Sequence, residues 1–140
     1  MKRKMLSLVG VLALLLLGGS AYAQTIKVKA NVPFDFIVNG ETLPAGQYTI
    51  DSLGVLDGRT LVVRSQGLDK QMLISTNSAQ SLKVSDKTRL IFHCYDQRYF
   101  LSEIWVAGND RGHQLPRGRR EKELASNFPV RDVVVLARAR

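Results

Sequence analysis

The chain has very few residues that usually hold metals or form cross-links: one cysteine, Cys94, and two histidines, His93 and His113. A single cysteine excludes an intramolecular disulfide. The wide separation of the two histidines matches no zinc-site spacing, so we predict no metal ligand. Cys94 lies beside Phe92 and Tyr95, and we expect it to be a small buried core residue. A reactive thiol and a dimer-forming disulfide remain its alternatives.

The sequence also lacks the motifs of common enzyme classes. There is no Gly-x-Ser-x-Gly nucleophile elbow, and we expect the serines to lie in turns and strand edges without a nearby histidine. Phosphate-binding loops and dinucleotide fingerprints are absent, so we predict no cofactor. Asp35 or Glu103 could supply a carboxylate pair, but any β domain of this size contains such pairs by chance. We predict no catalytic residues, with a carboxylate-based hydrolase as an alternative.

Long apolar runs are absent apart from one near the N-terminus. Residues 1–23 have a positive start at Lys2, Arg3 and Lys4, an apolar run from 6 to 17, and the small-x-small site Ala21-Tyr22-Ala23. The run is shorter than the roughly 18–20 residues that cross a bilayer. We therefore predict a signal peptide over 1–23 and one domain over 24–140. The expected location is periplasmic or extracellular, with no transmembrane helix after cleavage.

Positive charge is in mild excess, with 20 Lys and Arg against 12 Asp and Glu. The densest basic segment contains Arg117, Arg119, Arg120 and Lys122, interrupted by acidic residues. Such a segment is either a solvated surface or a contact for an anionic glycan, a lipid head group or an acidic protein face. We expect no nucleic-acid binding, because the segment has no interleaved aromatic residues and the protein is exported.

Short runs rich in Val, Ile, Thr, Tyr and Phe alternate with Gly, Asn or Asp clusters. This rhythm predicts an all-β fold, either a single antiparallel β-sandwich or a partly closed barrel, of about seven to nine strands. The strands are expected over residues 25–30, 34–38, 46–53, 60–65, 70–75, 88–95, 99–107 and 133–138. Lys27, Lys29, Arg138 and Arg140 are expected to protect outer strands from edge pairing.

One short surface helix is predicted over residues 119–126, within a polar segment, 108–127, that otherwise forms no regular element. Gly118 is the expected N-cap, and Glu121 occupies the N3 position of a capping box. The helix has almost no apolar stripe beyond Leu124. We therefore expect it to lie on the surface or to be ordered by a partner.

The strand over 99–107 has apolar residues at both odd and even positions, which predicts a central strand covered on both faces. Strict alternation places Tyr99, Glu103 and Trp105 on one face. A carboxylate among apolar neighbours either meets an arginine or lines a cavity. This face is one candidate for ligand or partner binding.

Two parts of the chain resemble a family of short, signal-peptide-bearing bacterial proteins of uncharacterised function. The first runs from Val32-Pro33-Phe34-Asp35-Phe36 to Leu43-Pro44-Ala45-Gly46-Gln47-Tyr48. The second comprises Phe92-His93, Tyr99-Phe100-Leu101-Ser102-Glu103-Ile104-Trp105, Leu115-Pro116 and Arg120-Glu121-Lys122-Glu123-Leu124. In that family a serine often occupies the position of Gly118. The resemblance implies no catalytic residues.

The sequence therefore predicts an exported, non-enzymatic binding or envelope-associated module. Its candidate sites are the face with Tyr99, Glu103 and Trp105 and the basic segment with Arg117, Arg119, Arg120 and Lys122. The expected partner is an anionic envelope component or a protein. An alternative is a carrier of a small apolar ligand, with an interior lined by Phe34, Phe36, Phe92 and Trp105.

Overall fold

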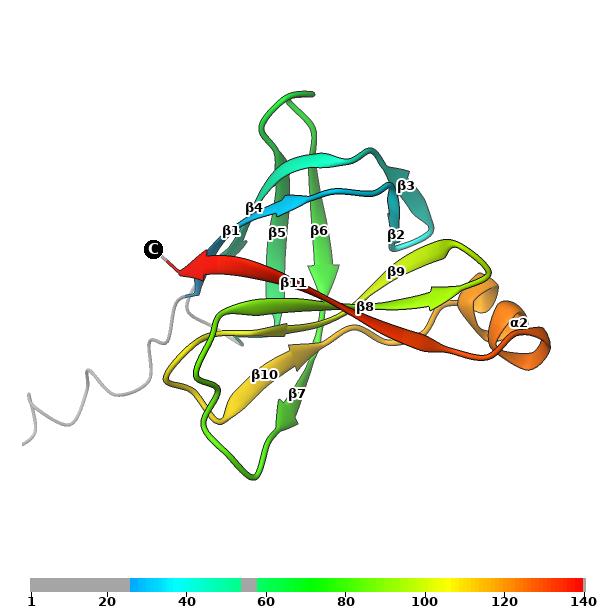
Figure 1. Cartoon of the computed structure of the whole chain (residues 1–140). Coiled ribbons are helices and arrows are strands. Elements are labelled where there is room, and N and C mark those ends of the chain that lie inside the picture. The colour runs from blue at the N-terminus through cyan, green and yellow to red at the C-terminus, as the bar shows by residue number, and fades with distance from the viewer. Residues whose placement is uncertain (1–25, 54–57, 140) are drawn as a thin grey trace, which may run out of the picture.

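A computed structural model describes residues 26–53 and 58–139. The described chain is mostly strand, with one short helix, and forms a curled mixed sheet in the shape of a half-barrel (Figure 1). The predicted all-β class is confirmed. The predicted signal peptide, residues 1–23, lies outside the described residues.

The described residues contain eleven strands joined in one sheet. In chain order, the first six are β1 (Lys27–Val32), β2 (Phe36–Val38), β3 (Glu41–Leu43), β4 (Gly46–Ser52), β5 (Thr60–Ser65) and β6 (Gln71–Ser75). The others are β7 (Asn77–Gln80), β8 (Arg89–Tyr95), β9 (Arg98–Trp105), β10 (Arg111–Gln114) and β11 (Arg131–Ala139), with helix α2 (Arg119–Asn127) between the last two.

The strand order is β3-β2-β9-β8-β11-β1-β4-β5-β6, and β10 pairs with both β9 and β7. Every pair is antiparallel except β2 with β9, which is parallel. The strand count exceeds the predicted seven to nine because β3, β7 and β10 are short pieces with little apolar pattern. In particular, β10 shows that the expectation of no strand between residues 108 and 127 is wrong.

The position of β1 and β11 corrects a second expectation. Both strands lie inside the sheet, between β8 and β4, so Lys27, Lys29 and Arg138 do not guard an edge. The ends of the strand path are β3 and β6. Arg140 lies outside the described residues. These charged side chains are typical of outer strands, but strand order depends on contacts between distant parts of the chain.

The main core lies on one side of the sheet, where aromatic rings contact one another. Phe92 is fully buried and meets Phe34 and Phe36 edge-to-face, at ring-centroid distances of 4.9 and 5.4 Å. Trp105 is not part of this cluster. Thus three of the four rings of the predicted carrier interior pack against each other. Cys94 is also buried, as predicted.

Strand β9 contains a β-bulge. Odd-numbered residues face the core before the bulge, and even-numbered residues face it afterwards. Glu103 pairs with Ile91 and Leu101 pairs with Phe92, so Ser102 is the extra residue. Tyr99 and Leu101 face the core before the bulge, and Ile104 faces it afterwards. Glu103 and Trp105 therefore lie on the opposite face from Tyr99, which corrects the prediction that the three share a face.

The predicted helix is confirmed as α2, with Gly118 as its N-cap. It is the single helix in residues 26–53 and 58–139, and it is neither long nor apolar enough to cross a membrane. Leu124 and Ala125 of α2 pack against a small cluster of Ile37, Tyr95 and Phe100. We call the side of β8 and β9 covered by α2 the helix face of the sheet.

Candidate functional sites

Helix α2 is fastened to the helix face through a buried carboxylate, Glu121, which is only 5% exposed. Its Oε2 accepts a hydrogen bond from the Tyr95 hydroxyl at 3.0 Å and lies 3.0 Å from His93 Nδ1. Arg117 Nε lies 3.5 Å from the same oxygen. Buried acids need such partners, because an unpaired charge in the interior is costly. Glu121 makes no side-chain capping hydrogen bond, so the predicted capping box is wrong.

Tyr95 is fully buried, and its hydroxyl contributes directly to this anchor. Burial, together with the hydrogen bond to Glu121, raises the pKa of the Tyr95 hydroxyl. The phenol therefore stays protonated at neutral pH and acts as a donor. This role of Tyr95 could not be predicted from the sequence, since Tyr95 and Glu121 are far apart in the chain.

His93 extends the network to the bulged residue. Its Nε2 lies 3.1 Å from Ser102 Oγ and 3.6 Å from Asp132 Oδ1. The expectation that no serine lies near a histidine is therefore wrong: the bulge directs Ser102 towards His93. The order Ser102, His93, Glu121 has the hydrogen-bonding pattern of a nucleophile, base and acid.

The surroundings of Ser102 favour a structural role for this chain of hydrogen bonds. Ser102 is 4% exposed, and neither it, His93 nor Glu121 is among the residues that line the pocket described below. A hydrolase needs substrate access to the nucleophile and donors for the oxyanion. We therefore assign the network to holding α2 on β8 and β9.

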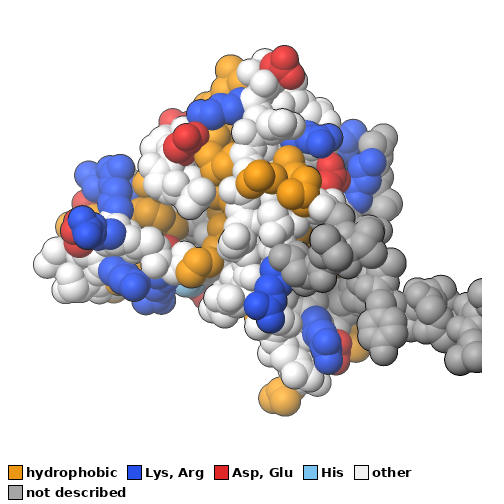
Figure 2. Space-filling model, turned by 180° about the vertical axis from the view of Figure 1, so that it is seen from behind, with side chains coloured by type: hydrophobic (Ala, Val, Ile, Leu, Met, Phe, Trp, Pro, Cys, Tyr) orange, Lys and Arg blue, Asp and Glu red, His pale blue; other side chains and the backbone are white. Residues whose placement is uncertain are grey.

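Helix α2 presents the basic segment to solvent. Arg119, Arg120 and Lys122 are exposed, and Glu123 is the exposed acid among them. Arg117 is half-exposed and is engaged with Glu121. Figure 2 shows Lys and Arg side chains gathered at the helical end of the molecule, with a few acidic side chains between them. We call Arg119, Arg120 and Lys122 the α2 basic surface.

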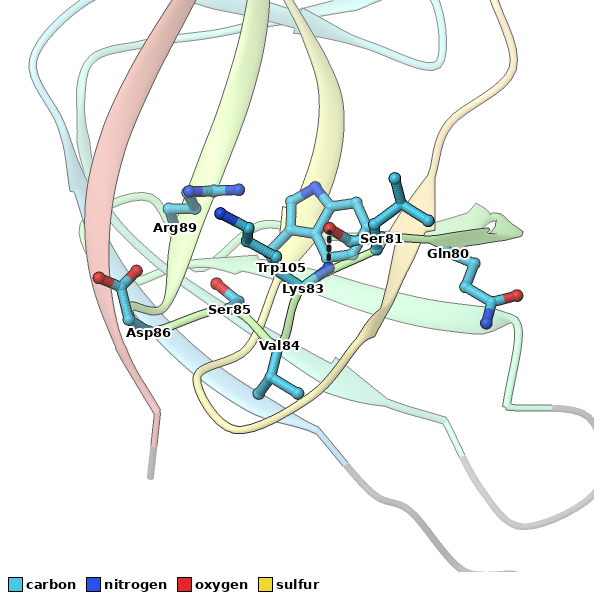
Figure 3. A pocket seen from close by; sticks show the side chains of 9 residues that line it. Gln80, Ser81, Lys83, Val84, Ser85, Asp86, Arg89 and Trp105 are labelled. Carbon is cyan, nitrogen blue, oxygen red and sulfur yellow. Dashed lines mark hydrogen bonds between the residues drawn. The ribbon is translucent and has the colours of Figure 1, made fainter.

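A pocket of about 790 Å³ lies at the Trp105 end of β9 (Figure 3), and this end of the strand points away from α2 (Figure 1). Trp105 and Arg89 contribute to it from paired positions on β9 and β8. The rest of the lining comes from the end of β7 and the segment after it, and consists of Gln80, Ser81, Leu82, Lys83, Val84, Ser85 and Asp86. The pocket thus combines an aromatic ring with two cations and one acid.

Two contacts fix the indole of Trp105 in this pocket. Its Nε1 donates a hydrogen bond to Glu103 Oε2 at 2.7 Å. Gly112 of β10 lies against the ring, since a Cβ at that position would be 2.7 Å from the indole carbons. The partner of the Glu103 carboxylate is therefore the indole N–H of Trp105, whereas the sequence predicted either an arginine partner or a place in a cavity lining.

The remaining residues singled out from the sequence lie elsewhere. Tyr99 stacks on Phe34 on the core side, with ring centroids 3.9 Å apart. Asp35 Oδ1 accepts a hydrogen bond from the backbone N–H of Ala45 at 2.9 Å, which shapes the turn before β4. Within residues 26–53 and 58–139, no three His, Cys, Asp or Glu side chains gather in a way that would hold a metal ion.

Comparison with known proteins does not connect these sites to a described activity. No family model, no curated protein and no solved structure matches the chain. The resemblance to a bacterial family of exported proteins therefore stays a prediction, and any function has to be argued from the sites themselves.

Proposed function

We propose that the protein is an exported binding module that attaches to an anionic component of the cell envelope through the α2 basic surface. The observation that carries this proposal is that three exposed cations lie on a helix whose position is set by a buried carboxylate. Export is supported by the pattern of residues 1–23, and the partner's charge by the excess of Lys and Arg.

The anchoring of α2 determines how the cations are presented. Glu121 faces the sheet, where it meets Tyr95 and His93. Its charge is thereby removed from the exposed side, where three cations outnumber one acid. A fixed helix also loses little conformational freedom when it binds, which favours affinity. The segment therefore differs from a solvated surface in which acidic and basic side chains alternate freely.

The proposal is tested by neutralising the three exposed cations together, as Arg119→Gln, Arg120→Gln and Lys122→Gln. Arg117 is left intact because it contacts Glu121. Each Lys or Arg near an anionic membrane contributes about 1 kcal/mol to binding. The triple variant should therefore lose about 3 kcal/mol, which is roughly a hundredfold in affinity.

The assay is sedimentation of the protein with phosphatidylglycerol vesicles, with phosphatidylcholine vesicles as the neutral reference. Binding of the wild-type protein should weaken as salt is raised, because the charges are exposed. A matched control removes the same charge elsewhere, at Lys27→Gln, Lys87→Gln and Arg111→Gln, all of which are exposed. Equal losses in the two triple variants would show that net charge alone is responsible, and would refute the α2 basic surface as the site.

A further inference from the structure

We infer that the pocket beside Trp105 binds a small organic anion, with its oxyanion group held by Arg89 and Lys83 and its apolar part beside Trp105. The inference is independent of the proposed function, because the pocket and α2 lie at different ends of β9 (Figure 1). A volume of about 790 Å³ is within the usual range for small-molecule sites.

Arg89 supplies the first argument for an anion. Its Nε is buried, and no described residue accepts a hydrogen bond from it. Buried donors are almost always paired in folded proteins, and an unpaired donor on a charged group is especially unfavourable. Arg89 also lines the pocket. The covered Nε becomes reachable after a small shift of the Arg89 side chain, which a carboxylate or phosphate in the pocket would favour by accepting from the planar guanidinium.

Lys83 supplies the second argument. It approaches from the segment after β7 and lies on the same side of the indole as Arg89 in Figure 3. Two cations directed to one pocket repel each other unless a negative charge lies between them. Asp86 also lines the pocket and offsets part of this charge, which leaves an excess of one positive charge for a ligand.

Trp105 limits the apolar part of the ligand. The indole is fixed by Glu103 and Gly112, so it is ready for contact without rearrangement. Only 6% of Trp105 is exposed, so a ligand touches part of the ring and cannot cover it. A compact body such as a phenyl ring therefore fits this site better than a long chain.

The sole tryptophan of the chain makes the pocket easy to observe, since all indole fluorescence comes from Trp105. Three probes of similar size are titrated: phenyl phosphate, benzoate and neutral benzyl alcohol. We expect a saturable change in fluorescence with at least one anion and none with benzyl alcohol at the same concentrations. The tighter of the two anions identifies the oxyanion group. An equal response to benzyl alcohol, or no saturable response to either anion, would overturn the inference.

Variants then locate the anion. Arg89→Gln and Lys83→Gln should each weaken binding of the anionic probe at least tenfold, whereas Lys87→Gln, outside the pocket lining, should leave it unchanged. Lys83 is exposed, so its variant gives a result even where Arg89→Gln is unstable. Unchanged affinity in Lys83→Gln would refute the assigned role of Lys83. The α2 triple variant should bind the probe normally, which separates this inference from the proposed function.

Discussion

Replacing Glu121 with alanine tests the buried anchor on which the orientation of α2 depends. The change leaves the Tyr95 hydroxyl without its acceptor at a fully buried position, which costs about 1–3 kcal/mol. It also leaves His93 without its closest carboxylate. Losing a hydrogen bond to a charged group costs about 1.5–3 kcal/mol, and because His93 keeps Ser102 and is partly exposed, its share lies at the lower end of that range. We expect a total loss of about 4 kcal/mol.

A loss of this size is a large fraction of the roughly 5–15 kcal/mol that stabilises an ordinary domain. The measurement is urea unfolding, combined with hydrogen exchange of the α2 amides. Exchange should accelerate in α2 more than in the core strands, because Glu121 holds the helix to the sheet. The control is Glu123→Ala on the exposed side of the same helix, which should change stability by less than about 0.5 kcal/mol. If Glu121→Ala costs no more than Glu123→Ala, the anchor does not exist as described.

Three further predictions concern other parts of the molecule. Burial lowers the pKa of His113, whose Nδ1 lies 3.0 Å from Thr76 Oγ1. The unfolded chain therefore binds a proton at this histidine more readily than the folded chain does, and stability measured in urea should fall as pH drops below about 6.5. The fall should be smaller in His113→Gln, which lacks the titrating group. Gly112→Ala places a Cβ 2.7 Å from the Trp105 ring and should destabilise the fold by about 1–3 kcal/mol with a shift in Trp105 fluorescence; an unchanged spectrum would argue against this contact. Ser102 should resist labelling by a fluorophosphonate, and peptide mapping that finds the label on Ser102 would show that the network is reactive.

The all-β class and the one helix could be predicted from the sequence because both depend on local patterns. Val, Ile, Tyr and Phe clusters between turn residues indicated most of the longer strands. Gly118 marked the start of α2, and the polar character of the helix indicated a surface position. The burial of Cys94 followed from its apolar neighbours.

The candidate sites could be predicted only in part, because they join residues that are distant in the chain. Glu121 stands at the N3 position, where a capping role is the simplest local explanation. Its actual partners, His93 and Tyr95, are reached only after α2 folds back onto β8. Similarly, Arg89 meets the segment after β7 only through the pairing of the strands. Local pattern carries no information about such contacts.

The bulge in β9 is an intermediate case, since the sequence contains a signal that fits more than one interpretation. Apolar residues at both odd and even positions predict two covered faces. They also fit a single shift in alternation at Ser102, after which Ile104 takes the core side. Both features are present: β9 is covered on two faces, by the main core at Leu101 and by α2 at Phe100, and its register also shifts at Ser102.

Strand β9 has one residue more than it needs for its side chains to alternate strictly between the core and the opposite face. Without Ser102, the run from Tyr99 to Val106 would alternate strictly, with Leu101 and Ile104 still directed to the core. Deleting this serine should therefore keep the register with β8 and leave Leu101 in the core, whereas deleting Leu101 would keep the register but put Ser102 in its core position. Bulges also bend and twist the strand that carries them. The shortened protein would thus be expected to fold with a flatter sheet, which makes Ser102 a point at which the curvature of the half-barrel can be adjusted independently of its core.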